Sequence, residues 1–422
     1  VFADEELKAK PWTRGSMLSN EVYSFQLAYC WRGRMLKNIN VRIESELSPW
    51  IRVRKVELIP SEMPCYWDHD DNILRSTPGL YPDLLKPIDK DGLTFLPNQW
   101  RSIWITIDPQ SKAKAGLYPI DIILENQEGE ELGRERFEIE LIGKELPKQS
   151  LIHTQWFHCD CLATWYGVEV FSEVHWEIIE RYVKTAAEHG INMILTPIFT
   201  PPLDTEVGGE RPTVQLVDVE KSGSTYSFGF EKLKRWFDMC RANGIEYFEF
   251  SHLFTQWGSK HAPKIVAREN GELKRIFGWD TDATSEEYKN FLDQFLPELV
   301  RFIKDNGLEY VSYFHVSDEP RLDDLEAYKS ASEIIKKHLK GFLIIDALSN
   351  YEFYEKGLVE NPIPASNHIE PFLENKVPNL WTYYCCSQYK EVANRFFYMP
   401  SARNRILGIQ LYKFDIVGFL QW

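Results

Sequence analysis

The chain of 422 residues is long enough for two or three domains, since a (β/α)₈ barrel alone takes about 250 residues. Its 63 acidic and 48 basic residues give a net charge of −15, which disfavours nucleic acid and anionic membranes as partners. No apolar run approaches the roughly 18 residues that a membrane span needs, so no span is expected.

Residues 1–147 carry short runs of alternating apolar and polar residues without a helical period. Residues 100–107 alternate most clearly, and similar runs occupy residues 22–29, 39–43, 51–58, 116–124 and 137–142. The stretch from Pro60 to Pro97 looks like a long irregular loop. The pattern predicts an N-terminal β-sandwich domain over residues 1–147.

Beyond residue 147 the pattern changes to repeated units of helix, glycine and buried strand. Apolar helix faces follow Ser172, begin near Phe230, follow a possible capping box of Thr284 and Glu287, and begin near Leu325. Strands are expected at 151–157, 191–195, 245–250, 308–314 and 342–345, and weaker ones at 364–367, 380–384 and 407–411. Eight such strands predict a (β/α)₈ TIM barrel over residues 148–422. An open doubly wound sheet is disfavoured because no glycine-rich phosphate loop follows any strand.

Catalytic residues of such barrels lie at the carboxyl ends of the strands. The fourth strand ends in Asp318 and Glu319, followed by Pro320. Glycosidic cleavage needs a proton donor and a second group that stabilises an oxocarbenium-like centre, and two adjacent carboxyl groups can keep one of them protonated. Acidic residues also stabilise a helix start, but Asp323 and Asp324 already serve the next helix. The pair therefore predicts a glycosidase with Asp318 and Glu319 as catalytic residues.

The seventh expected strand contains no carboxylate, although many retaining barrel glycosidases carry a nucleophilic Glu there. Direct double displacement by that arrangement therefore lacks its nucleophile. Substrate-assisted hydrolysis fits better, because the 2-acetamido group of the sugar can attack its own anomeric carbon. Asp318 would then orient the amide, and Glu319 would act first as acid and then as base.

The segment from Phe314 to Pro320 (FHVSDEP) resembles the strand-four motif of glycoside hydrolase family 123. Residues 78–83, 381–386 and 418–422, and the order of a β-sandwich before a barrel, are also similar to that family. The resemblance implies an exo-acting β-N-acetylgalactosaminidase, with Asp318 orienting the acetamido group and Glu319 as acid and base. It also implies a further C-terminal domain beyond residue 422.

Aromatic and polar residues near the strand ends are candidates for binding the sugar. Position favours a stacking platform on the seventh strand, and hydrogen bonds to hydroxyl or acetamido oxygens are expected from polar groups nearby. Packing is the alternative for each aromatic residue. The candidates are Trp381, Tyr383, His315, Asn350, Trp156, His158 and Trp422, with Trp257 and Trp279 behind them.

The seven cysteines have no regular spacing and do not predict a disulfide framework. Histidines occur at four strand ends, but none has the spacing of a zinc motif, so neither a metal nor a cofactor is expected. The odd cysteine count and the lack of a visible signal peptide favour the cytoplasm, and secretion after removal of a leader stays open.

The expected partner is an oligosaccharide or glycoconjugate with a terminal β-linked N-acetylhexosamine. One alternative is a glycosidase without acetamido participation that uses another carboxylate, such as Glu249 or Glu370, as base or nucleophile. The other is an inactive carbohydrate-binding scaffold, which the intact Asp318–Glu319 pair argues against.

Overall fold

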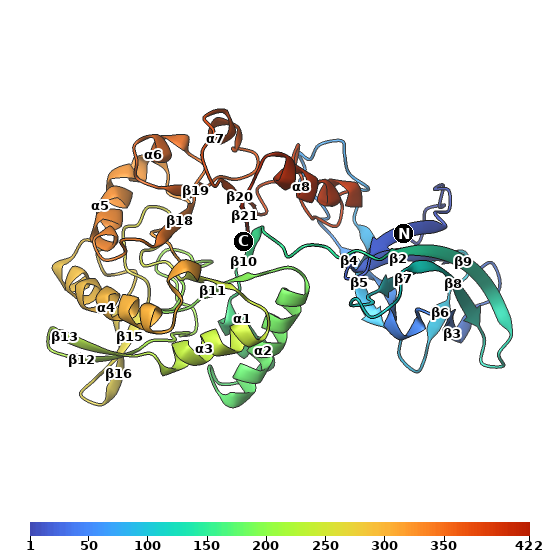
Figure 1. The fold of residues 1–422 in the computed structure, drawn as a ribbon, viewed down its shortest axis with the longest axis horizontal. Helices are drawn as coiled ribbons and strands as arrows, with labels where there is room; N and C mark the ends of the chain where they lie inside the picture. The colour runs from blue at the N-terminus through green and yellow to red at the C-terminus, as the bar shows by residue number, and fades with distance from the viewer. The chain divides into compact units, whose positions relative to one another are not determined.

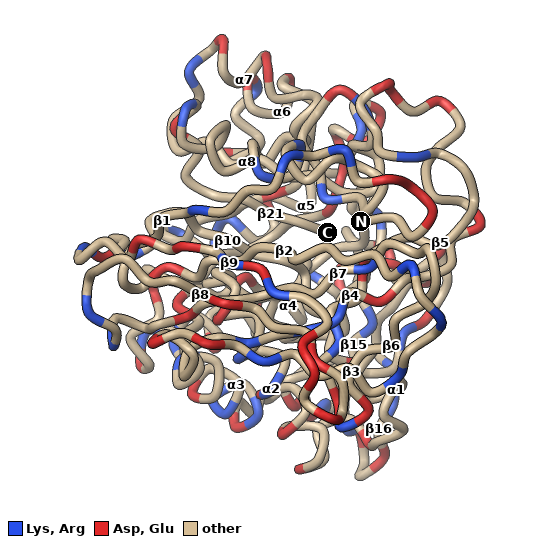
Figure 2. Tube along the Cα trace, turned by 90° about the vertical axis from the view of Figure 1, so that its right-hand side faces the viewer, with Lys and Arg blue, Asp and Glu red and all other residues tan.

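The computed structural model describes residues 1–422. Its chain divides into two compact units. The N-terminal unit comprises Val1–Lys148 together with Arg395–Ser401, and the barrel unit comprises Gln149–Asn394 and Ala402–Trp422 (Figure 1). Acidic and basic residues are interspersed along the chain (Figure 2). None of the helices combines the length and apolarity that a membrane crossing requires.

Two β-sheets build the N-terminal unit. One has the order β1-β9-β8-β3-β6, with bounds Arg14–Leu18, Glu131–Ile142, Gly116–Glu125, Leu36–Glu44 and Leu93–Phe95. The other has the order β2-β7-β4-β5, with bounds Tyr23–Cys30, Trp100–Ile107, Ile51–Ser61 and Gly79–Pro87. Alternate residues of β7 are buried in a core to which both sheets contribute. The expected β-rich region is confirmed, and its description as a sandwich stays a prediction.

The stretch from Pro60 to Pro97 is more regular than expected, because it contains β5 and β6. The prolines of this stretch argued against a strand in the sequence pattern. Since β5 pairs only with β4 at the edge of its sheet, Pro82 and Pro87 do not interrupt a ladder on the outer side. A 3₁₀ turn, Ser48–Trp50, precedes β4.

Eight parallel strands form the barrel sheet, as predicted. In chain order they are β10 (Ile152–Gln155), β11 (Met193–Thr196), β14 (Tyr247–Phe250), β17 (Ser312–Phe314), β18 (Leu343–Ala347), β19 (Asn361–Ile363), β20 (Trp381–Tyr384) and β21 (Gly418–Gln421). Their order in the sheet is β19-β18-β17-β14-β11-β10-β21-β20. A parallel bridge between Ala365 and Tyr383 joins the two ends, so the barrel is nearly closed.

Helices connect the strands on the outside of the barrel (Figure 1). They are α1 (Cys159–Tyr166), α2 (Glu173–Glu188), α3 (Glu231–Ala242), α4 (Glu286–Asp305), α5 (Leu325–Lys336), α6 (Tyr351–Glu355), α7 (Glu370–Glu374) and α8 (Ser401–Lys413). Two hairpins, β12 (Asp218–Ser222) with β13 (Thr225–Gly229) and β15 (Ile265–Glu269) with β16 (Glu272–Phe277), form a separate four-stranded sheet. Short 3₁₀ turns at Glu309–Val311 and Leu322–Asp324 flank β17 and α5.

Helix starts follow the side chains available to cap them. The Ser172 hydroxyl accepts the His175 N–H and begins α2, as the sequence predicted. The predicted capping box of α4 was wrong. Ser285 caps that helix, because the N–H and hydroxyl of Thr284 both bond to Asp282 in the preceding turn.

Two late strands were misplaced by the sequence pattern. Residues 407–411 belong to α8, and β21 is the eighth strand. The alternation of Leu407, Ile409 and Leu411 imitates a strand, but Arg403, Leu407 and Leu411 share one helix face and turn inward. The sixth strand precedes its expected residues 364–367 and ends at Ile363.

Strand alternation directs successive side chains to the outside and to the inside of the barrel. On β14, Phe248 and Phe250 face the helices, and the Phe248 ring lies 4.5 Å from that of Phe237 on α3. Glu249, between them, points inward. The same alternation places Tyr313 of β17 and the following His315 inside, where a buried apolar cluster that contains Tyr313 and Trp381 accompanies the polar groups Glu249 and His315.

Candidate active site

One cavity of about 480 Å³ in the barrel unit contains both predicted catalytic residues. Its lining residues end or follow the barrel strands, so it opens at the carboxyl ends of the strands, where barrel active sites lie. The lining consists of Trp156, Asp204, Thr205, Glu206, Gln256, Trp257, Asp318, Glu319, Ala347, Tyr383, Cys385, Cys386, Ser387, Leu420 and Trp422.

The backbone at Glu319 allows two adjacent carboxyl groups to face one cavity. In an extended strand, neighbouring side chains point to opposite sides. Glu319 has φ 43°, a left-handed conformation that costs a non-glycine residue about 1–3 kcal/mol and is typical of functional sites. Its N–H donates to the carbonyl of Ala347 at 2.9 Å, and the carbonyl of Asp318 accepts the N–H of Trp257 at 2.9 Å. These bonds fix the pair from both neighbouring strands.

Electrostatics distinguish the two carboxyl groups. Burial and the neighbouring charge of Glu319 raise the pKa of Asp318 well above its usual value. The Tyr383 hydroxyl donates a hydrogen bond to Oε1 of Glu319. Burial, and then the charge of Glu319, raise the pKa of Tyr383, so this phenol remains a neutral donor.

A buried charged network lies inside the barrel, next to the catalytic strand. His315 Nε2 is 3.0 Å from Glu249 Oε2, and its Nδ1 is 3.5 Å from Asp346 Oδ1. Burial alone lowers the pKa of His315, but the two carboxylates outweigh it and raise the pKa to about 9. His315 is therefore an imidazolium at neutral pH, and its charge lowers the pKa of Asp318 while Asp346 raises it.

Other side chains hold the carboxylates of this network. Glu249 also accepts bonds from the hydroxyl of Thr154 and from Nε1 of Trp156, the latter at 3.4 Å. Asp346 accepts the N–H of Val316 at 2.9 Å and the Tyr328 hydroxyl. Burial raises the pKa of Asp346, and the hydrogen bond with His315 opposes that rise.

His252 stacks on His315 with ring centroids 4.2 Å apart and planes 20° from parallel. Neither of its ring nitrogens has a hydrogen-bond partner, and burial together with the charge of His315 holds its pKa well below the usual value. His252, His315 and Asp346 offer atoms within 4.8 Å of one another. His315 faces a carboxylate on each side, and each oxygen of Asp346 accepts a hydrogen bond, so these buried groups are paired with one another.

Asp204 also lines the cavity, although it was not among the site residues chosen from the sequence. Its Oδ2 lies 3.0 Å from Nε2 of His158 and 3.5 Å from Nη1 of Arg211, and the side chain of Trp422 hydrogen-bonds to it. Burial alone raises the pKa of Asp204, but these partners lower it overall. Arg211 also donates two hydrogen bonds to Asp160, from Nε to Oδ2 and from Nη2 to Oδ1, each 3.0 Å long. The only sequence signal for Asp204 was its place in the long connection after β11.

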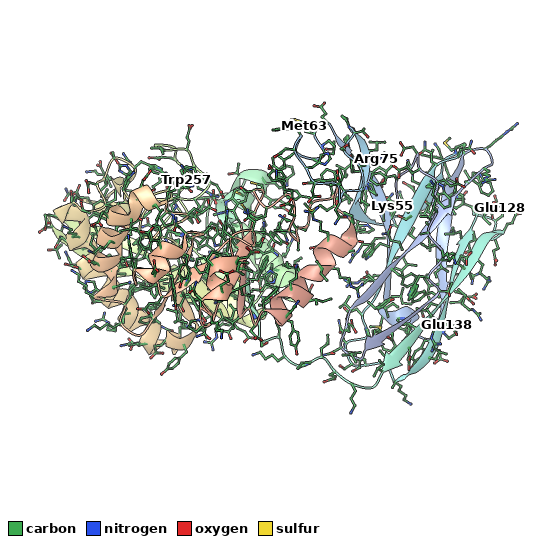
Figure 3. The ribbon with its side chains drawn as sticks, turned by 90° about the horizontal axis from the view of Figure 1, so that it is seen from above. Lys55, Met63, Arg75, Glu128, Glu138 and Trp257 are labelled. Carbon is green, nitrogen blue, oxygen red and sulfur yellow. The ribbon has the colours of Figure 1, made fainter.

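Trp257 is half-exposed in the cavity wall, and Figure 3 shows it on the barrel unit. It begins three consecutive left-handed residues, with φ values of 56°, 126° and 57° for Trp257, Gly258 and Ser259. A side chain at Gly258 would approach Asp324 Oδ1 to 2.7 Å, so the turn requires glycine there. Such a fixed, accessible indole suits stacking on a sugar face.

The remaining candidates fall into three groups. Trp156, Tyr383 and Trp422 line the cavity with the catalytic pair, and His158 touches the cavity wall through Asp204. His315 lies buried inside the barrel. Trp381 and Asn350 do not reach the cavity.

Trp381 and Asn350 have structural contacts instead. Trp381 shares the inward face of β20 with Tyr383 but lies two residues deeper, where it packs 5.9 Å from the ring of Tyr313. The side chain of Asn350 accepts the N–H of Glu352 at 3.2 Å and caps α6.

The alternative carboxylates are also outside the cavity. Glu249 is fully buried among its hydrogen-bond partners, and Glu370 is exposed at the start of α7. Four carboxylates line the cavity, namely Asp204, Glu206, Asp318 and Glu319.

Comparison with known proteins identifies the family of the chain. Residues 156–422 match the family described as glycoside hydrolase 123, catalytic domain. A family 123 glycoside hydrolase from Clostridium perfringens, studied for glycolipid glycan hydrolysis, has a TM-score of 0.74 at 14% identity, covering 98% of this chain and 74% of its own.

Other similarities are weaker. A β-glucuronidase from Parabacteroides merdae has a TM-score of 0.33 at 12% identity, and the match covers 91% of this chain and 48% of the other. A family 5 mannosidase from Rhizomucor miehei has a TM-score of 0.34 at 13% identity, and the match covers 69% of this chain and 83% of the other. TM-scores this low do not indicate a shared fold over the whole chain. A search of curated protein sequences found no match. Because the family match spans more than half of the sequence, the chain belongs to glycoside hydrolase family 123 and is a glycosidase.

Proposed function

We propose that this glycosidase is an exo-acting β-N-acetylhexosaminidase that prefers N-acetylgalactosamine and retains anomeric configuration through substrate assistance. One observation carries the proposal. Asp318 and Glu319 line the cavity side by side, while the seventh strand offers Glu319 a tyrosine hydroxyl and no carboxylate. The preference for N-acetylgalactosamine rests on the family. We also infer that the two N-terminal sheets form a β-sandwich.

In the first step, the acetamido oxygen attacks the anomeric carbon and the glycosidic bond breaks. Glu319 gives its proton to the departing oxygen, and Asp318 accepts a hydrogen bond from the amide N–H and stabilises the oxazolinium cation. In the second step, Glu319 takes a proton from the water that opens the oxazolinium ring. Two inversions at one carbon give net retention.

The proposed roles require a proton on Glu319, whereas burial favours the neutral form of Asp318. An amide N–H placed against Asp318 favours its charged form, so sugar binding would transfer the shared proton to Glu319. His315 supports this transfer through its positive charge. Tyr383 occupies Oε1 of Glu319 and leaves Oε2 free to carry the proton.

A panel of chromogenic β-glycosides of N-acetylgalactosamine, N-acetylglucosamine, galactose and glucose tests the proposal. Both 2-acetamido sugars should be hydrolysed far faster than the 2-hydroxyl sugars. A thiazoline analogue of the cyclised sugar should bind much more tightly than the free sugar, because it resembles the intermediate. Asp318→Asn should lower kcat more than it raises KM.

A 2-fluoro sugar provides the opposing test. Trapping of an enzyme carboxylate, with no inhibition by the thiazoline, would establish direct displacement and contradict substrate assistance. Peptide mapping would then identify the nucleophile, and Asp204 and Glu206 are the carboxylates that share the cavity with the pair.

A further inference from the structure

The cavity wall contains two adjacent thiols that the proposed reaction does not use. Cys385 and Cys386 directly follow β20, and both line the cavity that holds Asp318 and Glu319. Both are free, with Cys386 exposed and Cys385 half-buried. The other five cysteines, Cys30, Cys65, Cys159, Cys161 and Cys240, do not line this cavity.

Buried amides hold this turn in place. The N–H of Cys385 donates to Oε1 of Gln388 at 2.8 Å, and the N–H of Ser387 lies 3.5 Å from the Cys385 sulfur. Nδ2 of Asn394 donates to the carbonyls of Cys385 and Gln388 at 3.0 and 2.7 Å. Because Gln388 and Asn394 are buried, the two sulfurs are presented on a fixed part of the wall.

We propose that Cys385 and Cys386 are a site of reversible modification by small disulfides, and that modification closes the cavity to the sugar. The proposal rests on the proposed function in one respect, namely that the sugar binds in this cavity. Any thiol adduct larger than a hydrogen atom would occupy space beside Glu319 and Tyr383, which line the same cavity.

The exchange begins at the exposed thiol. The Cys386 thiolate attacks one sulfur of the disulfide, the bond between the two reagent sulfurs breaks, and a bond to Cys386 forms. The departing thiolate takes up the proton that Cys386 released. In total, the Cys386 sulfur and one reagent sulfur form a mixed disulfide, and the other reagent sulfur leaves as a thiol.

The half-buried partner is the poorer nucleophile of the two thiols. Burial raises the pKa of Cys385, hydrogen bonds with Ser387 oppose the rise, and the neighbouring Cys386 and Glu319 add to it. Direct attack by Cys385 on the disulfide is therefore disfavoured, and the exposed Cys386 reacts first.

Oxidised glutathione is the probe for this site. The reduced wild type, Cys386→Ser and Cys385→Ser are each incubated with it, alongside Cys161→Ser, which removes an exposed thiol outside the cavity. Peptide mass spectrometry measures which cysteines are modified. Hydrolysis of an aryl glycoside is measured relative to each protein's own untreated rate, before and after dithiothreitol.

The wild type and Cys161→Ser should lose most of their rate, carry the modification at residues 385–386 and recover with reductant. Cys386→Ser should keep its own rate, and Cys385→Ser should lose its rate as the wild type does, because the mixed disulfide forms at Cys386. Bound N-acetylgalactosamine should slow modification. Adducts confined to other cysteines, or full occupancy of 385–386 with an unchanged rate, would overturn the proposal. The mass measurement needs no sugar, so it separates this failure from a wrong substrate assignment.

Discussion

Glu319 combines a strained backbone with a hydrogen bond from Tyr383, and the proposed acid role depends on both features. Glu319→Gln should lower kcat/KM for glycosides with poor leaving groups by about 10²–10⁴-fold, because these need a proton as the bond breaks. Activated aryl glycosides should lose less. Glu206→Gln, at another carboxylate of the cavity, should change both substrate types by the same factor. Equal losses for Glu319→Gln on both types would remove Glu319 from the acid role.

The raised pKa of His315 predicts that the stability of the folded protein depends on pH. Its pKa of about 9 lies above the ordinary value of about 6.5, so its charge stabilises the folded state fully below pH 6.5. That contribution is lost as pH rises towards 9, by at most about 1.4 kcal/mol for each pH unit. Denaturant unfolding at several pH values should show the decline.

Histidine NMR assigns this effect to one residue. One imidazole should titrate near pH 9 and disappear in His315→Gln, while His252 should remain neutral over the same range. If every imidazole signal titrates below pH 7, the buried imidazolium is wrong.

Among the elements, β20 and β21 show how closely neighbouring strands constrain each other. Gly418 and Trp381 are register partners, and a Cβ at Gly418 would lie 2.0 Å from the indole. Gly418→Ala should therefore destabilise the protein by about 1–3 kcal/mol through overpacking. Gly408→Ala is the control, because it adds a methyl group in open space within α8 and should stabilise the helix by up to about 1 kcal/mol. Thermal or urea unfolding that shows the same effect for both would refute the packing argument.

Local patterns predicted most barrel elements because helix caps and strand alternation act over a few residues. The pattern failed where two periods coincide, as at residues 407–411, which alternate like a strand and also present one helical face. At the cavity, the strand-end rule located Asp318, Glu319 and Tyr383. It could not exclude Trp381, because the depth of a residue within a barrel depends on strand register. The same rule reached the connection from Thr196 to Asp204, but that connection has no period that would have selected Asp204 as a site residue.

At the scale of the whole molecule, a segment near the C-terminal end of the sequence belongs to the N-terminal unit. Residues 395–401 pack with the N-terminal unit, where Tyr398 and Met399 join Phe2 and Tyr81 in one buried cluster. The carbonyl of Tyr398 also accepts the N–H of Leu74 at 2.7 Å. The chain therefore passes between the two units three times, near residues 148, 394 and 401.

This topology predicts that cutting one connection does not separate the units. A specific protease site introduced into exposed residues 144–148 should give two fragments that still elute together in size-exclusion chromatography. The same cut in a Tyr398→Ala variant should release the N-terminal fragment more readily, because it removes a ring that is 1% exposed. Immediate separation of the wild-type fragments would show that the segment contributes little.

The same cluster affects how the protein is made. Tyr81 leaves the ribosome long before Tyr398, and at about 5–20 residues per second the interval is on the order of tens of seconds. During that time Phe2 and Tyr81 have no Tyr398 or Met399 to bury them. This small cluster of the N-terminal unit is therefore completed only after most of the barrel unit has been synthesised.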